Sequence, residues 1–308
     1  MQQYKKLTPK AVLELAAPHT WPAAVFPVLL GSLLALVMTG KFHLGLFYST
    51  LGVCVLLQCG VNTLNDYADF IKGTDTVENS HDPTDAALVY HGFHPKKALA
   101  TGLVFLLLAF GCGIYTLCLC GWQPLIYGAL GGAVVLLYSF GKTPLSGLPV
   151  GEVSSGVVMG GLIPMACYYV QTGVHDPLIL LLALPMIISV GLIMMMNNTS
   201  DIERDLPVGR ITLPGILGRH KASLLLKVLL AGEFVILLLL GMEYFPWGMT
   251  LYPALALWMF LTVWPVWKGE LTPENRIRNM IRIVQIHSCV SVCWLLVIGG
   301  GYLMENFL

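Results

Sequence analysis

Charged side chains are scarce in this sequence. Only 11% of its 308 residues are charged and 56% are hydrophobic, whereas a soluble globular domain carries about 25% charged residues. This composition excludes an ordinary soluble domain and is typical of a membrane protein. Basic and acidic residues number 17 each, so the net charge gives no reason to expect a nucleic-acid partner.

Cysteine patterns that would bind zinc or build a disulfide framework are also missing. None of the eight cysteines belongs to a Cys-x-x-Cys pair, and no histidine is spaced to complete a zinc site. All eight lie in or beside apolar segments, so we interpret them as small buried hydrophobic residues.

Long apolar runs, in contrast, are abundant. Spanning about 30 Å of hydrocarbon takes about 20 apolar helical residues. Nine runs of this kind occur, at 20–39, 43–66, 97–119, 123–140, 150–172, 176–198, 221–241, 246–266 and 279–303. No small-residue cleavage site follows the first run, so we expect it to be retained as a helix. The sequence therefore predicts an all-α polytopic membrane helix bundle of nine transmembrane helices.

The basic residues lie almost entirely on one side of these predicted spans. They precede the first run and follow the second, fourth, sixth and eighth, while the opposite side holds only Lys41. Basic residues near helix ends are retained in the cytoplasm. We therefore expect a cytoplasmic N-terminus, an external C-terminus and a location in a prokaryotic plasma membrane.

Two acidic motifs follow the second and sixth predicted helices. The first, NDYADFIKGTD at 65–75, places Asp66 and Asp69 on one helical face. The second, NNTSDIERD at 197–205, repeats Asn197, Asp201 and Asp205 at every fourth residue.

The two motifs lie four predicted helices apart, and each opens a long cytoplasmic loop, at 67–96 or 199–220. This arrangement indicates an internal duplication. We expect one membrane-embedded domain over 1–308, with pseudo-repeated units of about 1–140 and 141–308.

Carboxylates at the ends of membrane helices need a compensating partner, because an ionised Asp at mid-membrane costs roughly 2.5–3.5 kcal/mol on insertion scales. Mg²⁺ prefers oxygen ligands and commonly takes one or two carboxylates while phosphate oxygens and water fill its other positions. A single acidic cluster is equally typical of solvated residues at a helix end. Two matched clusters favour a site for Mg²⁺ and a diphosphate.

Several basic residues are predicted on the same membrane face as the acids, namely Lys72, Lys142, Arg204 and Arg210. Each is a candidate to hold a diphosphate, and each is alternatively a determinant of membrane topology. Tyr138 precedes Lys142 in the segment after the fourth helix, so we expect it to contribute to an aromatic pocket.

These residues and motifs give the sequence a resemblance to the UbiA-type membrane prenyltransferases, and within them to the 1,4-dihydroxy-2-naphthoate polyprenyltransferases of menaquinone biosynthesis. The matching segments are LELAAPHTWPAAVFPVLLG at 13–31, NDYADFIKGTD at 65–75, YSFGKTPLSGLPVGE at 138–152, YYVQTG at 168–173 and NNTSDIERDLPVGRITLPGILG at 197–218. The last third of the chain offers little beyond hydrophobicity.

The resemblance implies Mg²⁺-dependent transfer of a polyprenyl group from an allylic diphosphate to an aromatic acceptor, with the lipid tail in contact with membrane lipid. It assigns catalysis to Asp66, Asp69, Asp201 and Asp205. It assigns Mg²⁺ binding to these four residues and Asp75. It assigns substrate binding to Asn65, Lys72, Tyr138, Lys142, Asn198 and Arg210.

The chain departs from the family pattern at two places. Ala17 precedes Pro18 where the family usually has Arg, and the segment DPTDAALVYHG at 82–92 lacks a basic residue. These departures leave the acceptor open, with 4-hydroxybenzoate, homogentisate, haem or a lipid phosphate as alternatives, and they also leave open a homologue without activity. A separate alternative is a membrane transporter or cation channel, in which the carboxylates would line a pathway.

Overall fold

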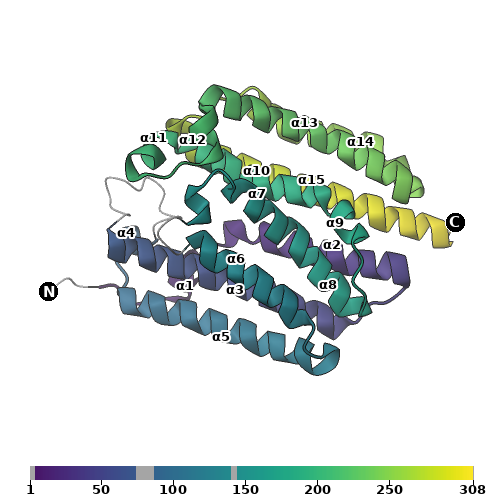
Figure 1. The fold of residues 1–308 in the computed structure, drawn as a ribbon, viewed down its shortest axis with the longest axis horizontal. Coiled ribbons are helices and arrows are strands. Elements are labelled where there is room, and N and C mark those ends of the chain that lie inside the picture. Colours follow the sequence, from purple (N-terminus) through teal and green to yellow (C-terminus); the bar gives the residue numbers. More distant parts are fainter. Residues whose placement is uncertain (1–3, 74–86, 140–143, 308) are drawn as a thin grey trace. The chain divides into compact units, whose positions relative to one another are not determined.

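The computed structural model describes residues 4–73, 87–139 and 144–307. Over these ranges the chain consists of helices joined by short connections, coloured from purple to yellow in Figure 1. The single extended pairing within them is a bridge between Lys5 and Phe93. The prediction of an all-α fold is therefore confirmed.

Two compact units divide the chain, and each is described by itself. The N-terminal unit holds Met1–Val25 and Tyr48–Leu119, and the C-terminal unit holds Phe26–Phe47 and Cys120–Leu308. The N-terminal unit is built from α1 (Pro9–Leu15), the 3-10 helix η1 (Pro18–Thr20), the start of α2 (Pro22–Thr39), most of α3 (Leu44–Lys72), α4 (Ala87–His91) and α5 (Pro95–Cys120).

α1 begins where the sequence supplies a cap. Thr8 Oγ1 accepts the backbone N–H of Ala11 at 3.2 Å, which satisfies one of the donors that every helix start leaves open. The helix stops before Ala17, the one non-glycine residue of the described ranges with a positive φ, +47°. This left-handed conformation costs an L-residue roughly 1–2 kcal/mol, and it separates α1 from the membrane helix that follows.

α3 and α5 approach each other through glycines. A Cβ atom on Gly60 would lie 2.7 Å from Leu106 Cδ2, and one on Gly102 would lie 2.9 Å from the Leu64 side chain. Real Cβ atoms do not come this close to a neighbour, so larger residues at either position would push the two helices apart.

The C-terminal unit holds the remaining helices. They are α6 (Pro124–Ser139), η2 (Leu145–Gly147), α7 (Gly151–Ser155), the π-helix η3 (Gly156–Leu162), α8 (Ile163–Thr172), α9 (Leu178–Leu182), α10 (Leu184–Ser200), α11 (Ile202–Asp205), η4 (Leu206–Val208), α12 (Leu213–Leu217), α13 (Arg219–Tyr244), η5 (Pro246–Leu251), α14 (Tyr252–Trp267), η6 (Pro273–Asn275) and α15 (Arg276–Phe307).

α10 lies at the centre of this unit. It contacts α7, η3, α12, α13 and α15, and in Figure 1 its axis lies roughly parallel to those of α13, α14 and α15, although α10 and α15 run in opposite directions along the chain. Met186 and Met196 of α10 are buried in a core that also holds Trp294 of α15. The Trp294 indole N–H donates to the Leu182 carbonyl oxygen at 2.8 Å, so this large buried side chain is also satisfied as a donor.

α7, η3 and α8 form one continuous apolar span, Gly151–Thr172. A Cβ atom on Gly160 would lie 2.6 Å from Ile187 Cα of α10, and one on Gly156 would overlap the Ile187 carbonyl oxygen. Only glycine fits at both positions, so the two helices touch backbone to backbone. This close approach brings the start of the span beside the end of α10.

Seven helical segments of the described chain are long and apolar enough to cross a membrane. They are Pro18–Thr39, Leu44–Ile71, Pro95–Cys120, Gly151–Thr172, Arg219–Tyr244, Pro246–Trp267 and Pro273–Asn306. Two further apolar helices, Pro124–Val135 and Leu184–Ser200, are shorter. All nine overlap predicted runs, so the chain is a polytopic helical membrane protein.

Candidate functional site

The second acidic motif lies at the end of α10, where the chain turns into α11. Asp201 and Asp205 are both buried, and the backbone N–H groups of both bond to carbonyls four residues earlier. The predicted stripe of every fourth residue is thus present. The helix itself is interrupted at Asp201, which has φ −103° and ψ 12°.

Each of the two aspartates is paired with an arginine from another segment. Arg276 at the start of α15 donates from Nε to Asp201 Oδ2 at 3.0 Å. Arg210 Nη1 lies 3.1 Å from Asp205 Oδ1. These pairs offset much of the cost of burying two carboxylates in an apolar unit.

Arg276 also binds the start of the motif, one helical turn before Asp201. Its Nη2 donates to Asn197 Oδ1 at 2.9 Å, so one planar guanidinium holds two positions of α10 at once. Arg204 of the motif itself stands farther away, with Nη1 3.9 Å from Asp201 Oδ1.

Arg219 contacts the same segment, where α10 ends and α11 begins. Arg219, the first residue of α13, donates to both carboxylate oxygens of Glu203, at 2.7 and 2.6 Å. Its Nε and Nη2 also approach the Thr199 carbonyl oxygen at 3.4 Å. The end of α10 and the start of α11 are therefore fixed to α13.

Arg210 is positioned by the segment between α6 and α7. The backbone N–H of Ile211 donates to the Gly147 carbonyl at 2.8 Å, and Arg210 Nη2 donates to the Ser146 carbonyl at 3.3 Å. The buried Tyr138 hydroxyl lies near enough to Arg210 and Glu152 to feel both charges. Tyr138, Asn198, Asp201, Asp205 and Arg210, predicted from separate motifs, thus belong to one cluster.

Glu152 is an unpredicted member of this cluster. It is buried in the first turn of α7, and Asn198 Nδ2 donates to its Oε1 at 2.8 Å. Its signal in the sequence is weak, because Glu152 ends the 138–152 segment as a single acid beside glycine.

The charges around α11 shift two pKa values in opposite directions. Burial raises the pKa of Asp205, and the nearby Asp201 carboxylate raises it further, against the lowering effect of Arg210. The hydrogen bonds from Arg219 lower the pKa of Glu203. The motif therefore combines an acid that resists ionisation with one that is readily ionised.

The oxygens of this cluster fit a hard cation. Asp201 Oδ1 and Asp205 Oδ2 are buried and have no hydrogen-bond partner within the described ranges. No group of three or more His, Cys, Asp or Glu side chains among those residues could hold a metal ion alone. Two carboxylates that await water and phosphate oxygens are what Mg²⁺ commonly uses.

The first acidic motif lies in the N-terminal unit, at the end of α3. Asp66 is buried, and its Oδ2 accepts the backbone N–H of Leu88 at 3.3 Å, where α4 begins. Asp69 is half-buried and Asn65 is exposed. Asp75 and Lys142 fall outside the described residues, and nothing is described of the Lys72 side chain.

Two unpredicted polar residues precede Asp66 on α3. Asn62 donates to Thr20 Oγ1 at 2.8 Å and to the Ala16 carbonyl at 3.4 Å. Gln58 donates to the same Thr20 Oγ1 at 3.2 Å. These bonds connect α3 to the bend at Ala17, the position where this chain has alanine and the family usually has arginine.

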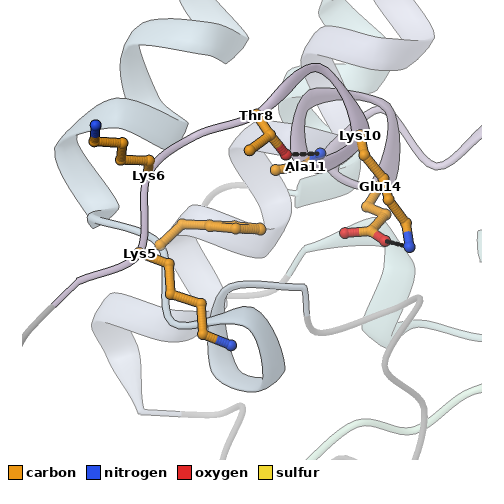
Figure 2. Close-up of a pocket in the computed structure, with 7 residues that line it drawn as sticks. Lys5, Lys6, Thr8, Lys10, Ala11 and Glu14 are labelled. Atoms are coloured by element: carbon orange, nitrogen blue, oxygen red, sulfur yellow. Dashed lines mark hydrogen bonds and ion pairs between the residues drawn. The ribbon is translucent and has the colours of Figure 1, made fainter.

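A separate hollow of about 200 Å³ lies in the N-terminal unit. Figure 2 shows Lys10 paired with Glu14 one turn along α1, with Lys10 Nζ 3.9 Å from Glu14 Oε1, while Lys5 and Lys6 extend on either side of the chain. The lining includes none of the predicted site residues.

The fold and the site together define a class: a polytopic helical membrane protein with acidic motifs at two helix ends, the second of which is paired with arginines. The model of the UbiA prenyltransferase family matches residues 24–285. The chain belongs to this family and is a prenyltransferase.

Individual relatives agree with the family. A 1,4-dihydroxy-2-naphthoate octaprenyltransferase of Bacillus subtilis is 33% identical over 266 residues, which are 86% of this chain and 82% of that protein. An enzyme of the same description from Haemophilus influenzae is 30% identical over 71% of this chain and 72% of its own.

Solved structures share the fold. A UbiA homolog from Archaeoglobus fulgidus bound to DMAPP and Mg²⁺ superposes with a TM-score of 0.62 at 16% identity, covering 96% of this chain and 99% of its own. At that identity, the likeness establishes the common helical architecture alone.

Proposed function

We propose that this prenyltransferase transfers a polyprenyl group from an allylic diphosphate to 1,4-dihydroxy-2-naphthoate, with Mg²⁺, in menaquinone biosynthesis. The observation that carries the proposal is the pair Asp201 and Asp205, each with one carboxylate oxygen held by an arginine and one buried oxygen without a hydrogen-bond partner among the described residues. The described activity of the Bacillus and Haemophilus relatives supports the acceptor. The ligands of the archaeal homolog support the donor and the metal.

In this proposal the carboxylates of both motifs bind Mg²⁺, namely Asp66, Asp69, Asp75, Asp201 and Asp205. Bound Mg²⁺ would neutralise the diphosphate as the allylic C–O bond ionises. Arg210, Lys142 and Lys72 bind diphosphate oxygens, and Asn65, Asn198 and Tyr138 line the substrate site. The carboxyl-bearing carbon of the dihydroxynaphthoate ring then attacks the allylic cation, the diphosphate leaves, and loss of CO₂ restores the aromatic ring of the demethylated quinol.

The burial of the site contributes as well. Asp201, Asp205, Asn198 and Glu152 are each less than 10% exposed, so water has little access to this corner. Exclusion of water protects an allylic cation from hydrolysis and strengthens electrostatic interactions.

We further propose that all nine apolar helices cross the membrane, as parts of one catalytic domain over 1–308. Helices of fewer than 18 residues, such as Leu184–Ser200, suit a span whose end is covered by protein. The loop charges support a cytoplasmic N-terminus, cytoplasmic acidic motifs and an external C-terminus.

The test is an assay in membranes with Mg²⁺, a radiolabelled polyprenyl diphosphate and a panel of aromatic acceptors. We expect a lipid-soluble product with dihydroxynaphthoate, and losses of at least about 100-fold for Asp201→Asn and Asp66→Asn. The exposed Glu305→Gln is the matched control and retains activity. Product with 4-hydroxybenzoate or homogentisate alone would change the acceptor, and Mg²⁺ uptake by proteoliposomes without any transfer would favour a transporter.

A further inference from the structure

Glu152 and Asn198 form a buried polar pair that the assigned roles do not explain. Glu152 is 4% exposed and Asn198 is 1% exposed. One hydrogen bond joins them, from Asn198 Nδ2 to Glu152 Oε1 at 2.8 Å. The other two oxygens, Glu152 Oε2 and Asn198 Oδ1, are buried without a hydrogen-bond partner in the described chain.

Leaving two such acceptors unsatisfied is expensive. A buried polar group without a partner costs about 1–3 kcal/mol, and more when it is charged. The joining bond also fixes the orientation of the Asn198 amide, because Nδ2 must face the carboxylate. The pair therefore presents two oriented oxygens that call for a hydrogen-bond donor.

The group that donates a hydrogen bond to these two oxygens is not a phosphate. Asn198 precedes Asp201 by three residues on α10, so it lies about 4.5 Å farther from the helix end, at 1.5 Å per residue. A diphosphate presents only acceptor oxygens at neutral pH, and the Glu152 carboxylate would repel it. A hydroxyl group, in contrast, can donate to either oxygen.

The surroundings suit an aromatic hydroxyl. Tyr138 of α6 places its buried hydroxyl, also without a partner among the described residues, within the field of Glu152 and Arg210. The cluster thus combines a tyrosine, a pair of hydrogen-bond acceptors and a nearby positive charge.

We propose that Glu152 and Asn198 form the subsite that binds a ring hydroxyl of the aromatic acceptor. This inference rests on the proposed function and adds a subsite to it. The hydroxyl stays protonated and donates a hydrogen bond to Glu152 Oε2. Oxygen electron density then moves into the ring, which makes the attacking carbon more nucleophilic.

Glu152→Gln is the sharpest variant. The Gln side chain has the same shape, and its Oε1 still accepts from Asn198. Its amide nitrogen replaces Oε2, so a hydroxyl no longer finds an acceptor there. Glu233→Gln is the matched control, because Glu233 is also fully buried in this unit with both oxygens unpartnered within the described ranges.

The experiment compares a dihydroxynaphthoate acceptor with its mono-O-methyl ether, for binding and for transfer. Sites built to bond a hydroxyl reject analogues that lack it by large factors. We expect wild type and Glu233→Gln to prefer the free hydroxyl by at least about 100-fold in kcat/KM. Glu152→Gln should reduce this preference below about 5-fold, with an unchanged KM for the polyprenyl diphosphate.

Three results would overturn the inference. The first is an intact preference in Glu152→Gln, and the second is an equal loss of preference in Glu233→Gln. The third is a rise in the KM of Glu152→Gln for the polyprenyl diphosphate as large as the rise in its KM for the aromatic acceptor. That result would indicate a purely structural role for Glu152. If wild type transfers to no acceptor, the proposed function fails, while equilibrium binding of the two analogues to wild type and Glu152→Gln still decides the subsite.

Discussion

Arg276 and Asp201 are 75 residues apart in the sequence, and they are joined by a hydrogen bond of 3.0 Å. The arginine is the first residue of the last helix, and the aspartate lies in the middle of the second acidic motif. Side chains of the pair are only 18% and 10% exposed. The motif is therefore completed by a part of the chain that carries no motif of its own.

Replacing Arg276 with Ala should destabilise the protein and weaken donor binding. Breaking a buried ion pair leaves an uncompensated carboxylate and costs about 3–5 kcal/mol. The unfolding temperature of Arg276→Lys should lie between those of wild type and Arg276→Ala, because an ammonium group keeps the charge but does not reproduce the planar guanidinium that reaches both Asp201 and Asn197. Thermal unfolding in detergent measures the loss. Arg278→Ala, at an exposed position of the same helix, is the control and should change the unfolding temperature little.

The Glu203–Arg219 pair should contribute to the free energy of unfolding at neutral pH, and this contribution should be lost in acid. Arg219 lowers the pKa of Glu203 in the folded protein, so the pair stabilises above the ordinary Glu pKa of about 4.3. This contribution is lost as the pH falls through the lowered folded-state value. The unfolding temperature of wild type should exceed that of Glu203→Gln at pH 6, and the two should converge towards pH 3. A constant difference would contradict the prediction.

The contribution of Asp205 to the free energy of unfolding should change with pH in the opposite direction. Burial raises its pKa, so the folded state keeps a proton that the unfolded state has lost. Stability from this group falls as the pH rises from about 3.9 through the raised value. Because Mg²⁺ binds the carboxylate form, the rise in unfolding temperature on adding Mg²⁺ should grow with pH. Asp205→Asn should abolish that dependence; an unchanged profile would remove Asp205 from the metal site.

Gly160→Ala should separate two helices and disturb the Glu152–Asn198 pair. The added methyl would meet the Ile187 backbone at 2.6 Å, and overpacking of this kind costs typically 1–3 kcal/mol, roughly. The unfolding temperature and the hydroxyl preference should both fall. Gly128→Ala on α6, where a Cβ meets nothing within 4 Å, is the control and should be neutral or stabilising.

The membrane helices were predictable because length and apolarity decide them. The predicted run 97–119 appears as Pro95–Cys120, for example. The run 176–198 is instead divided at Ala183 into α9 and α10. Pro185 explains the break, since proline lacks an N–H and disfavours the helical conformation before it.

The candidate site was predictable only in its local part. Asp201 and Asp205 recur at helical spacing within nine residues, so their motif is visible in one segment. Arg276 and Glu152 bond to partners 79 and 46 residues away, and a single basic loop residue is indistinguishable from a topology determinant. The π-helix η3 also interrupts the ordinary helical period between Glu152 and the rest of its span.

The distance along the chain between Arg276 and Asp201 also orders the assembly of the enzyme during its synthesis. At about 5–20 residues per second, translation reaches Arg276 roughly 4–15 s after Asp201. Until then Asp201 lacks the guanidinium that contacts it at 3.0 Å, and a nascent chain that stops before α15 carries the motif without this partner. Because the last helix to be synthesised brings Arg276 to the motif, we expect a product truncated before α15 to have a weakened site.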